Sequence, residues 1–343
     1  MIQSLLNQGI NQDLVKVKQE LYRNLKAQIV LDIEGPHFEI RRGVRQGDPL
    51  SPLLFNCALE EIFKNLEWEN LGIKINGERL SNLRFANDVV LVAESAENLQ
   101  SMIDDLVMES KKAGLEVNLS KTKILSNEKN PKLIKIGETL LENTEKIIYL
   151  GQLISFQDQT EIEIKRRIAI AWKRFWKLSH ILKQKLSISF KSHIFNSCIV
   201  PALSYGSQTW SLSKTLEKKL QVTQNTMERT MLNLSLRDRV SILKIKKKFR
   251  KNINIVHQVR RLKWDWAGHV SRMTDGRWTH KISFWQPTGK RRPGRQKARW
   301  EDNINKFTGT KLYHRLAADR TEWSRLREAY AQNQGFVRSF HVT

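Results

Sequence analysis

The sequence predicts an α+β fold, in which we expect three parts at residues 1–154, 155–255 and 256–343. In the first part, short apolar runs typical of strands alternate with segments whose apolar residues recur at helical spacing. From about Glu161 the period is helical, and tryptophan and arginine gather near the end. With 343 residues the chain is long enough for about two domains, each with a sizeable core.

The charge changes sharply along the chain. Residues 1–150 contain 19 Lys and Arg against 22 Asp and Glu, a net charge of −3, whereas residues 151–343 contain 40 against 13, a net charge of +27. A strongly basic half favours a polyanionic partner, because neutralising phosphates releases condensed counterions. We expect RNA or DNA, since the excess is interleaved with most of the tryptophans; a solvated basic surface is the alternative.

The hydropathy pattern excludes membrane and secreted proteins. No apolar run reaches the roughly 20 residues that a membrane span needs, and the polar start of the chain has no signal-peptide core. We therefore expect a soluble intracellular protein, in the nucleus or the cytoplasm, with no membrane partner. Cys57 and Cys198 each lie in an apolar run without metal-type spacing, which indicates reduced, buried thiols and no zinc knuckle.

The chain begins with an amphipathic helix, because apolar residues recur at helical spacing at Leu14, Val17, Leu21 and Leu25. Strand-like runs follow at residues 28–33 and 38–41. A loop with two glycines then leads into an apolar helix, for which we expect Ser51 as the N-cap and Pro52 as the first helical residue. A glycine loop before a helix is by itself weak support for phosphate binding.

The stretch from Leu83 to Ala93 consists of two apolar, strand-like runs with Asn87 and Asp88 at the bend. An acidic pair at the tip of a tight hairpin can present carboxylate oxygens to magnesium, because the strands fix the direction of those oxygens. Here the first member of the pair is an amide. The bend is therefore either a degenerate metal site or an ordinary hairpin.

The elements around this bend continue the alternation. A hairpin is predicted at Asn76-Gly77, a helix from Ser95 to Gly114, an edge strand at residues 115–123 and a short strand at 147–151. Further on, we predict basic helices at residues 161–178, 190–198 and 216–234, with an aromatic turn at 201–210. Together they indicate a basic helical bundle.

The last part combines indole and guanidinium groups, which suit single-stranded or structured nucleic acid because bases stack on aromatic rings while arginine contacts phosphate. The candidate residues are Trp264, Trp266, Arg272, Lys290, Arg291, Arg292, Arg295, Arg299 and Trp300. A small tryptophan core with a solvated basic loop is the alternative. His269 has no second ligand at metal spacing, so we expect it to pack and not to bind zinc.

Taken in order, four segments resemble motifs of LINE-type, non-LTR retrotransposon reverse transcriptases: Arg42–Phe55, Phe85–Asp88, Gly114–Lys123 and Tyr149–Gly151. The first is similar to the template and nucleotide loop, the second to the catalytic Phe-Ala-Asp-Asp hairpin. The resemblance implies a partial polymerase palm, an antiparallel sheet with helices on one face, followed by a basic helical thumb and a Trp/Arg-rich tail. It also implies roles for single residues: nucleotide or template contacts for Arg45, Gln46, Gly47 and Lys121, and primer contacts for Tyr149, Leu150 and Gly151.

Two departures from the family pattern bear on activity. The chain starts at about the first palm helix, so the resemblance implies a 5′-truncated reading frame that lacks the fingers and the first catalytic aspartate. Asn87 stands where the family has the metal-binding aspartate of the hairpin, which leaves Asp88 as the one acidic neighbour. The family uses Mg²⁺, and two ions must be held by carboxylates for nucleotidyl transfer. We therefore expect that magnesium is not bound productively here.

Three hypotheses remain open on the sequence. The chain is a catalytically defective remnant of a transposon-derived reverse transcriptase that still binds nucleic acid. Alternatively, it is an RNA- or DNA-binding protein re-used from a retrotransposon. The third possibility is an RNA-directed DNA polymerase that is active only as part of a longer chain.

Overall fold

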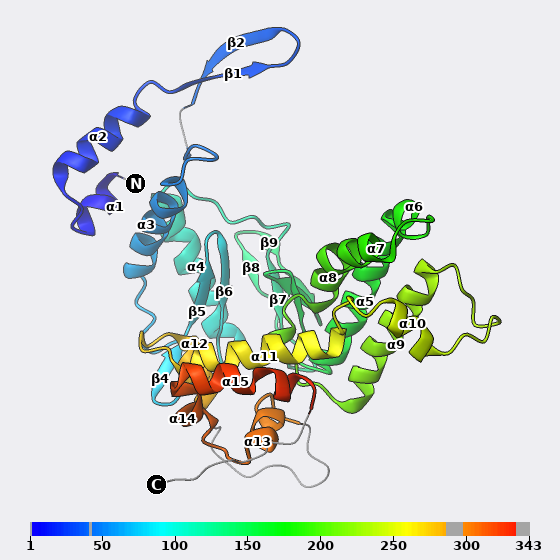
Figure 1. The fold of residues 1–343 in the computed structure, drawn as a ribbon. Helices are drawn as coiled ribbons and strands as arrows, with labels where there is room; N and C mark the ends of the chain where they lie inside the picture. Colours follow the sequence, from blue (N-terminus) through cyan, green and yellow to red (C-terminus); the bar gives the residue numbers. More distant parts are fainter. Residues whose placement is uncertain (1, 41–42, 286–297, 334–343) are drawn as a thin grey trace. The chain divides into compact units, whose positions relative to one another are not determined.

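The computed structural model describes residues 2–40, 43–285 and 298–333. It confirms a mixed helical and sheet fold, drawn as a ribbon in Figure 1. The chain divides into two compact units, Met1–Glu145 and Lys146–Thr343, which we call the first and the second unit. The three-part division at residues 154 and 255 stays a prediction.

The described elements of the first unit alternate as the sequence predicts. In order they are α1 (Ile2–Asn7), α2 (Gln12–Tyr22), β1 (Lys26–Val30), β2 (Glu34–Glu39), α3 (Ser51–Lys64), β3 (Ile73–Ile75), β4 (Glu78–Leu80), β5 (Asn82–Phe85), β6 (Asp88–Leu91), α4 (Ala96–Lys112), β7 (Lys123–Leu125), β8 (Lys135–Ile136), β9 (Thr139–Leu140) and β10 (Glu142–Thr144).

Local chemistry explains where the helices of the first unit begin. The Ser95 hydroxyl accepts a hydrogen bond from the Asn98 backbone N–H, so Ser95 caps α4 as expected. The expected cap at Ser51 is wrong. Leu50 is the N-cap of α3, and the Ser51 hydroxyl donates to the Arg45 carbonyl oxygen over 2.6 Å instead, because the loop folds back onto it.

The strands of the first unit pair only two by two within the described residues. Antiparallel hairpins join β1 to β2, β3 to β4, β5 to β6 and β8 to β9, whereas β7 and β10 run parallel. The predicted strand at residues 115–123 is wrong over most of its length, because Asn118 turns the chain by accepting from Lys121 N–H, and only Lys123 enters β7. The ladders therefore do not merge into one palm-like sheet.

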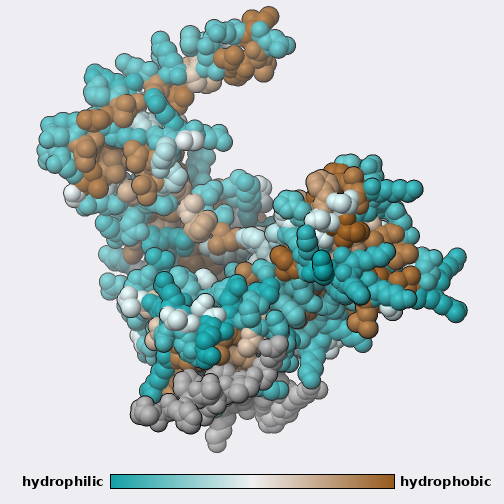
Figure 2. Space-filling view, in the orientation of Figure 1, coloured by the Kyte–Doolittle hydropathy of each residue, from teal (hydrophilic) through white to brown (hydrophobic). Residues whose placement is uncertain are grey.

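The core of the first unit is small. One cluster packs Ile103, Ile124, Ile134 and Leu141 together, and a second joins Leu5, Val15 and Leu54. Large apolar side chains stay exposed on α2 and on the β1–β2 hairpin, where Leu31 and Ile33 are 80% and 83% exposed. Figure 2 shows the apolar surface over these elements in its upper left.

The second unit is built mainly from helices. Its described elements are β11 (Ile147–Tyr149), β12 (Gln152–Ile154), α5 (Gln159–Lys177), α6 (Ser179–Leu182), α7 (Ile188–Ile194), the π-helical turn η1 (Phe195–Ile199), α8 (Val200–Ser204), the 3-10 turn η2 (Ser207–Thr209), α9 (Lys214–Met231), α10 (Ile242–Lys248), α11 (Ile255–Ser271), α12 (Trp278–Phe284), α13 (Asp302–Thr308), α14 (Tyr313–Ala318) and α15 (Arg320–Ala331). The aromatic turn expected at 201–210 is wrong at its start, since α8 continues the preceding helix to Ser204.

Two large apolar clusters hold the second unit together. One lies among α5, α8, α9 and the start of α11, and its fully buried members include Phe175, Leu220 and Met227. The other joins α11 to α15, where the rings of Trp264 and Trp323 stack with centroids 3.7 Å apart. Gly268 permits this contact, because a Cβ there would lie 2.3 Å from the Trp323 indole nitrogen.

No helix among the described residues is both long and apolar enough to cross a membrane. Cys57 and Cys198 are free thiols, as expected, but both are half-buried and not fully buried.

Candidate nucleic-acid interface

A two-residue turn, Ala86-Asn87, joins β5 to β6, and Asp88 is the first residue of β6, paired to Phe85. The hairpin predicted from the sequence is thus confirmed. Ala86 has a φ of +50°, a conformation that costs an L-residue free energy because its Cβ meets the following carbonyl. Phe85 through Asp88 are exposed, so the turn projects its polar side chains away from the core of the first unit.

Arg84 fixes this hairpin to α3. Its guanidinium donates to the Glu60 carboxylate over 2.8 Å and lies 4.4 Å from the centroid of the Phe63 ring. A residue just before the turn therefore joins the hairpin to the helix that follows the glycine loop. The carboxylate of Asp88 is left outside this contact.

The side chains at the turn do not fit a pair of divalent cations. Asp88 supplies one carboxylate and Asn87 one neutral amide oxygen, and within the described ranges no three His, Cys, Asp or Glu side chains gather closely enough to hold a metal ion. A two-magnesium site needs several carboxylates to balance the charge of the ions. We therefore derive no metal-dependent step from this turn.

The loop before α3 is tied back to α2. Lys18 is 3.2 Å from the Asp48 carboxylate, and the Arg45 guanidinium donates to the Leu21 carbonyl oxygen and lies 5.8 Å from the Tyr22 ring. Hydrogen bonds from the Leu50 backbone N–H and from Lys18 lower the pKa of Asp48. The predicted template contacts Arg45, Gln46 and Gly47 are exposed on this loop.

Lys121 is exposed in the Asn118 turn, where its backbone N–H donates to the Asn118 side chain. The described structure places it on the first unit, as it does the Asn87-Asp88 turn and the Arg45 loop. Its side chain is available to a phosphate, and no contact in the structure tests that role.

The predicted primer-side residues lie in the second unit, at the turn between β11 and β12. Leu150 and Gly151 both have positive φ angles, +47° and +74°, as a tight hairpin turn requires. The Tyr205 hydroxyl donates to the Leu150 carbonyl oxygen over 2.8 Å. Arg166 and Arg167 both donate to the Gly151 carbonyl oxygen. Three side chains thus fix the turn onto α5 and the end of α8.

Glu163 holds the two arginines that contact this turn. Its side chain is 1% exposed and accepts hydrogen bonds from Arg166, from Arg167 and from the Leu153 backbone N–H. A buried carboxylate that is satisfied by two arginines and an amide fixes their positions, because leaving any of them unpaired would carry a desolvation penalty. The predicted primer-side turn is therefore held in place by hydrogen bonds from side chains that are themselves fixed.

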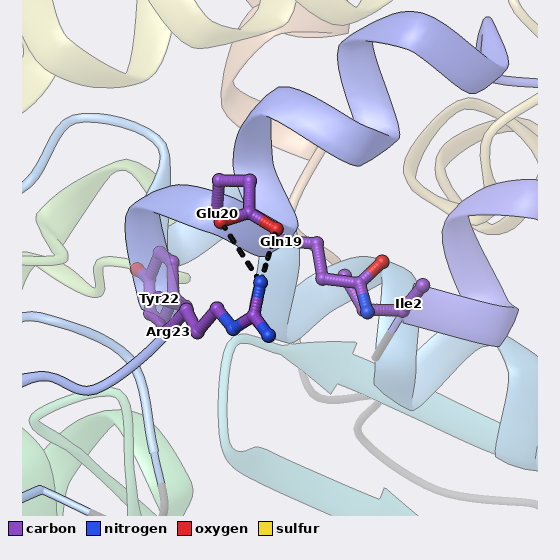
Figure 3. Close-up of a pocket in the computed structure, with 5 residues that line it drawn as sticks. All are labelled: Ile2, Gln19, Glu20, Tyr22 and Arg23. Atoms are coloured by element: carbon purple, nitrogen blue, oxygen red, sulfur yellow. Dashed lines mark hydrogen bonds and ion pairs between the residues drawn. The ribbon is translucent and has the colours of Figure 1, made fainter.

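A cavity of about 680 Å³ opens beside this turn. Its lining contains Tyr149, Leu150, Tyr205 and the amide side chains Gln152 and Gln258, and no charged residue. A second hollow of about 460 Å³ lies at the end of α2 in the first unit, where Glu20 pairs with Arg23 (Figure 3). None of the predicted site residues lines this second hollow.

The structure corrects the expectation for Trp264. Its ring is fully buried, and the indoles of Trp264 and Trp323 each donate to the other residue's carbonyl oxygen, over 2.8 and 3.0 Å. A base cannot stack on a ring that already stacks on another indole inside a core. For Trp264 the structure therefore supports the alternative, a small tryptophan core.

The other tail residues are less enclosed. Trp266 and Trp300 are half-buried, and the Trp300 indole donates to the Gln208 carbonyl oxygen over 2.6 Å. Arg272 donates to the Ala317 carbonyl oxygen, so its guanidinium supports the fold, whereas Arg299 is exposed. His269 is exposed, and its ring packs against that of Trp266 with centroids 5.6 Å apart, in line with the expected packing role. The predicted residues Lys290, Arg291, Arg292 and Arg295 lie outside the described residues.

A basic surface that the sequence reading did not single out lies on α10 and its flanks. Eight cations occur between Ser235 and Asn252, against the single acid Asp238: Arg237, Arg239, Lys244, Lys246, Lys247, Lys248, Arg250 and Lys251. Seven of these eight cations are exposed, and Lys246 is half-buried. The run of like charge was the signal that could have found it.

A buried carboxylate holds this surface in place. Glu228 on α9 is 0% exposed, and Lys246 lies 3.0 Å from it. Asn252 and Gln224 also donate to Glu228, over 3.1 and 2.7 Å. The segment that carries the cations is therefore anchored to one side chain of α9, through Lys246 within α10 and through Asn252 at the end of the segment.

Comparison with known proteins gives a consistent set of similarities. Residues 6–154 match the reverse transcriptase (RNA-dependent DNA polymerase) family. The chain is 32% identical over 272 residues to a transposon-derived protein of Caenorhabditis elegans, a match that covers 73% of this chain and 96% of that protein.

Shorter stretches are similar to retrotransposon polymerases of insects. Over 98 residues the chain is 42% identical to the Pol polyprotein of the type-1 retrotransposable element R2 of Nasonia vitripennis, covering 28% of this chain and 10% of that protein. Over 242 residues it is 25% identical to an RNA-directed DNA polymerase from the transposon X-element of Drosophila melanogaster, covering 63% and 26%. The chain thus spans nearly all of the nematode protein and a minor part of these two polymerases.

Proposed function

The chain belongs to the transposon-derived reverse transcriptases of the non-LTR type, and from this premise we propose that it binds RNA or DNA without transferring nucleotides. This family acts on nucleic-acid templates and uses divalent metal ions. The observation that carries the proposal is that one chain contains both a turn with an amide, Asn87, in the first unit and an anchored basic surface in the second.

The proposed loss of nucleotidyl transfer rests on Asn87. Magnesium bound at this turn would activate the primer hydroxyl and neutralise the leaving pyrophosphate. Asn87 keeps the size of an aspartate and removes its charge, so the turn presents one carboxylate, Asp88, where its relatives are expected to present two. Mutating residues that only support the direct ligands of a metal already lowers metal affinity or activity by about 10- to 100-fold, and losing a direct ligand should lower them further.

The proposed nucleic-acid binding rests on the second unit. Residues 151–343 carry a net charge of +27, and among their described cations those of the α10 surface are anchored by Glu228. Fixed cations lose less conformational entropy when they meet phosphates than cations on a loose chain do. We assign residues 1–154 to a partial palm, residues 155–255 to a thumb-like region and residues 256–343 to a nucleic-acid-binding tail.

Within this proposal, the exposed Arg45, Gln46, Gly47 and Lys121 of the first unit are the template contacts. The clamped turn of Tyr149, Leu150 and Gly151 in the second unit is the primer-side contact. Asp88 remains a weak cation ligand. These assignments follow the motif resemblance; the assigned residues are exposed except for Tyr149, which is half-buried.

A primer-extension assay tests the lack of activity. The full chain is incubated with a primed RNA template, deoxynucleotides and either Mg²⁺ or Mn²⁺, and we expect no extension. Asn87→Asp should also stay inactive, because no third acidic, histidine or cysteine side chain of the described residues joins the turn. Robust extension by the unaltered chain would contradict the proposal.

Salt-dependent binding tests the retained contact with nucleic acid. The affinity for a labelled RNA or DNA oligonucleotide should fall with salt on a log–log slope of about −0.7 to −0.9 per phosphate contact. Lys247→Gln together with Lys248→Gln on α10 should reduce the magnitude of the slope by about 1.5 to 2. Lys16→Gln together with Lys26→Gln on the first unit is the charge-matched control and should leave it unchanged. Negligible binding at low salt would refute this half of the proposal.

A further inference from the structure

Trp176 is the exposed tryptophan of this protein. All ten tryptophans lie in the described ranges, and Trp176 is 52% exposed whereas the other nine are buried or half-buried. It stands on the last turn of α5, next to Phe175, through which this helix enters the main core of the second unit. Exposing an indole is unfavourable in water, so its position needs an explanation.

The ring of Trp176 is held in a fixed orientation. It is stacked on the half-buried Trp172 with centroids 5.8 Å apart and an interplanar angle of 22°. The Phe175 ring meets it edge-on at 5.5 Å and 89°, and meets Trp172 at 5.3 Å and 72°. Because Phe175 is fully buried, these contacts fix the two indoles to the core. We call Trp172 and Trp176 together the indole ledge.

Cations surround the indole ledge, and acids are absent from its sequence neighbourhood. Lys173, Arg174 and Lys177 are exposed, and in the part of the chain that the structure describes none of them forms an ion pair. Lys173, Trp176 and Lys177 lie at i, i+3 and i+4, so they share one face of the helix. The sequence contains no Asp or Glu between Glu163 and Glu217. The ledge is therefore an aromatic surface in a positive environment.

We propose that the indole ledge is a stacking platform for single-stranded RNA or DNA. A base would stack on Trp176 while Lys173, Arg174 and Lys177 contact the neighbouring phosphates. Bases inside a duplex already stack on one another, so a free indole distinguishes unpaired from paired strands. Positive charge alone would bind single strands and duplexes alike. This inference rests on the proposed nucleic-acid binding and names the form of nucleic acid that the second unit selects.

The test measures oligonucleotide affinity of the full chain by fluorescence anisotropy at one fixed salt concentration. For a single-stranded oligonucleotide, Trp176→Ala should weaken binding by about 5- to 150-fold, the range expected for one base–aromatic stack. Trp176→Phe should restore part of the affinity. For an oligonucleotide of the same length with abasic sites throughout, Trp176→Ala should have no effect, because only the stack is lost.

The matched control is Phe190→Ala on α7. Phe190 is also an exposed aromatic residue, at 48%, and lies outside the ledge, so its removal should leave both affinities unchanged. Lys173→Gln should weaken intact and abasic strands equally and reduce the salt slope by about one contact.

The outcomes separate this inference from the proposed function. If the unaltered chain binds single strands and Trp176→Ala binds them equally well, or loses the same factor on abasic strands, the ledge is not a stacking platform. Equal affinity of the unaltered chain for duplex and single strands would overturn it as well. If the unaltered chain binds no oligonucleotide at low salt, the proposed function fails together with it.

Discussion

The two units of this protein differ in what holds them together. In the first unit the described core clusters each join a few side chains, strands pair two by two, and apolar residues of α2 and the β1–β2 hairpin are exposed. In the second unit one continuous cluster connects α5, α9 and α11, and a second joins α11 to α15. The unit that contains three of the four motif segments is thus the one with the smaller core.

The difference shows that a short motif can keep its local geometry in a unit with a small core, whereas stability comes from the larger cores of the other unit. The Asn87-Asp88 turn needs only two short strands and the Arg84 contact to keep its form. An ordered basic surface needs buried contacts as well, because its like charges repel one another. In the second unit, buried carboxylates such as Glu228 and Glu163 pair with some of these cations and fix their positions. We expect the second unit to be the more stable of the two.

The largest effect should come from the buried tryptophan of the second unit. Trp264→Ala removes a fully buried ring and its hydrogen bond to Trp323, and should lower the free energy of unfolding of this unit by about 3–5 kcal/mol. Denaturant titration followed by circular dichroism measures it. Trp176→Ala is the control and should change stability by less than about 0.5 kcal/mol. Equal losses in the two variants would contradict the distinction between core and ledge.

A smaller loss is expected at the buried carboxylate under α10. Glu228→Gln keeps an acceptor for Asn252 and Gln224 but leaves Lys246 without its counter-ion, and should cost about 2 kcal/mol. Loss of the anchor should also weaken RNA binding, as measured by filter retention. Glu20→Gln, at the exposed pair with Arg23, is the control and should be nearly neutral. Unchanged stability of Glu228→Gln would show that α10 is held by other contacts.

The buried lysine of α11 should make stability depend on pH. Lys263 is 2% exposed, donates to the Trp210 carbonyl oxygen over 3.2 Å and lies 5.2 Å from the Trp300 ring. Burial lowers the pKa of Lys263 from 10.5 to about 8, so between these values the unfolded chain binds more protons and stability rises with pH.

Lys263→Met should therefore exceed the unaltered chain in unfolding free energy by about 1–2 kcal/mol at pH 7, and the difference should shrink as the pH rises from about 8 to 10. Thermal unfolding across this pH range measures it. The exposed Lys218→Met is the control and should show a flat difference. A constant difference for Lys263→Met would show that burial does not lower the pKa of Lys263, because the folded and unfolded chains would then bind the same number of protons over this range.

The smallest effect should be at the turn of the first unit. Ala86→Gly relieves the cost of a φ of +50° and should stabilise this unit by less than about 1 kcal/mol, since glycine also loses more conformational freedom on folding. Hydrogen exchange of the β5–β6 amides reports the change. Ala113→Gly, at a negative φ of −84°, is the control and should destabilise instead. Destabilisation by Ala86→Gly would show that the turn is not strained.

Much of the local structure could be predicted from the sequence. The helical spacing at Leu14 and Leu21, the cap at Ser95 and the hairpin at Asn87 are confirmed, because each depends on residues that are close in the chain. The family resemblance is confirmed as well, since its motifs are short and ordered. The roles of the single site residues stay predictions.

The sequence by itself determined the family, the alternation of elements and the concentration of positive charge in the second half. Only the tertiary structure decided that Trp264 is enclosed, that Trp176 is exposed, and that Glu228 anchors the α10 cations. Periodicity tells which residues share a helix face but not which face another helix covers. That depends on contacts between residues far apart in the chain, such as the stack of Trp264 on Trp323.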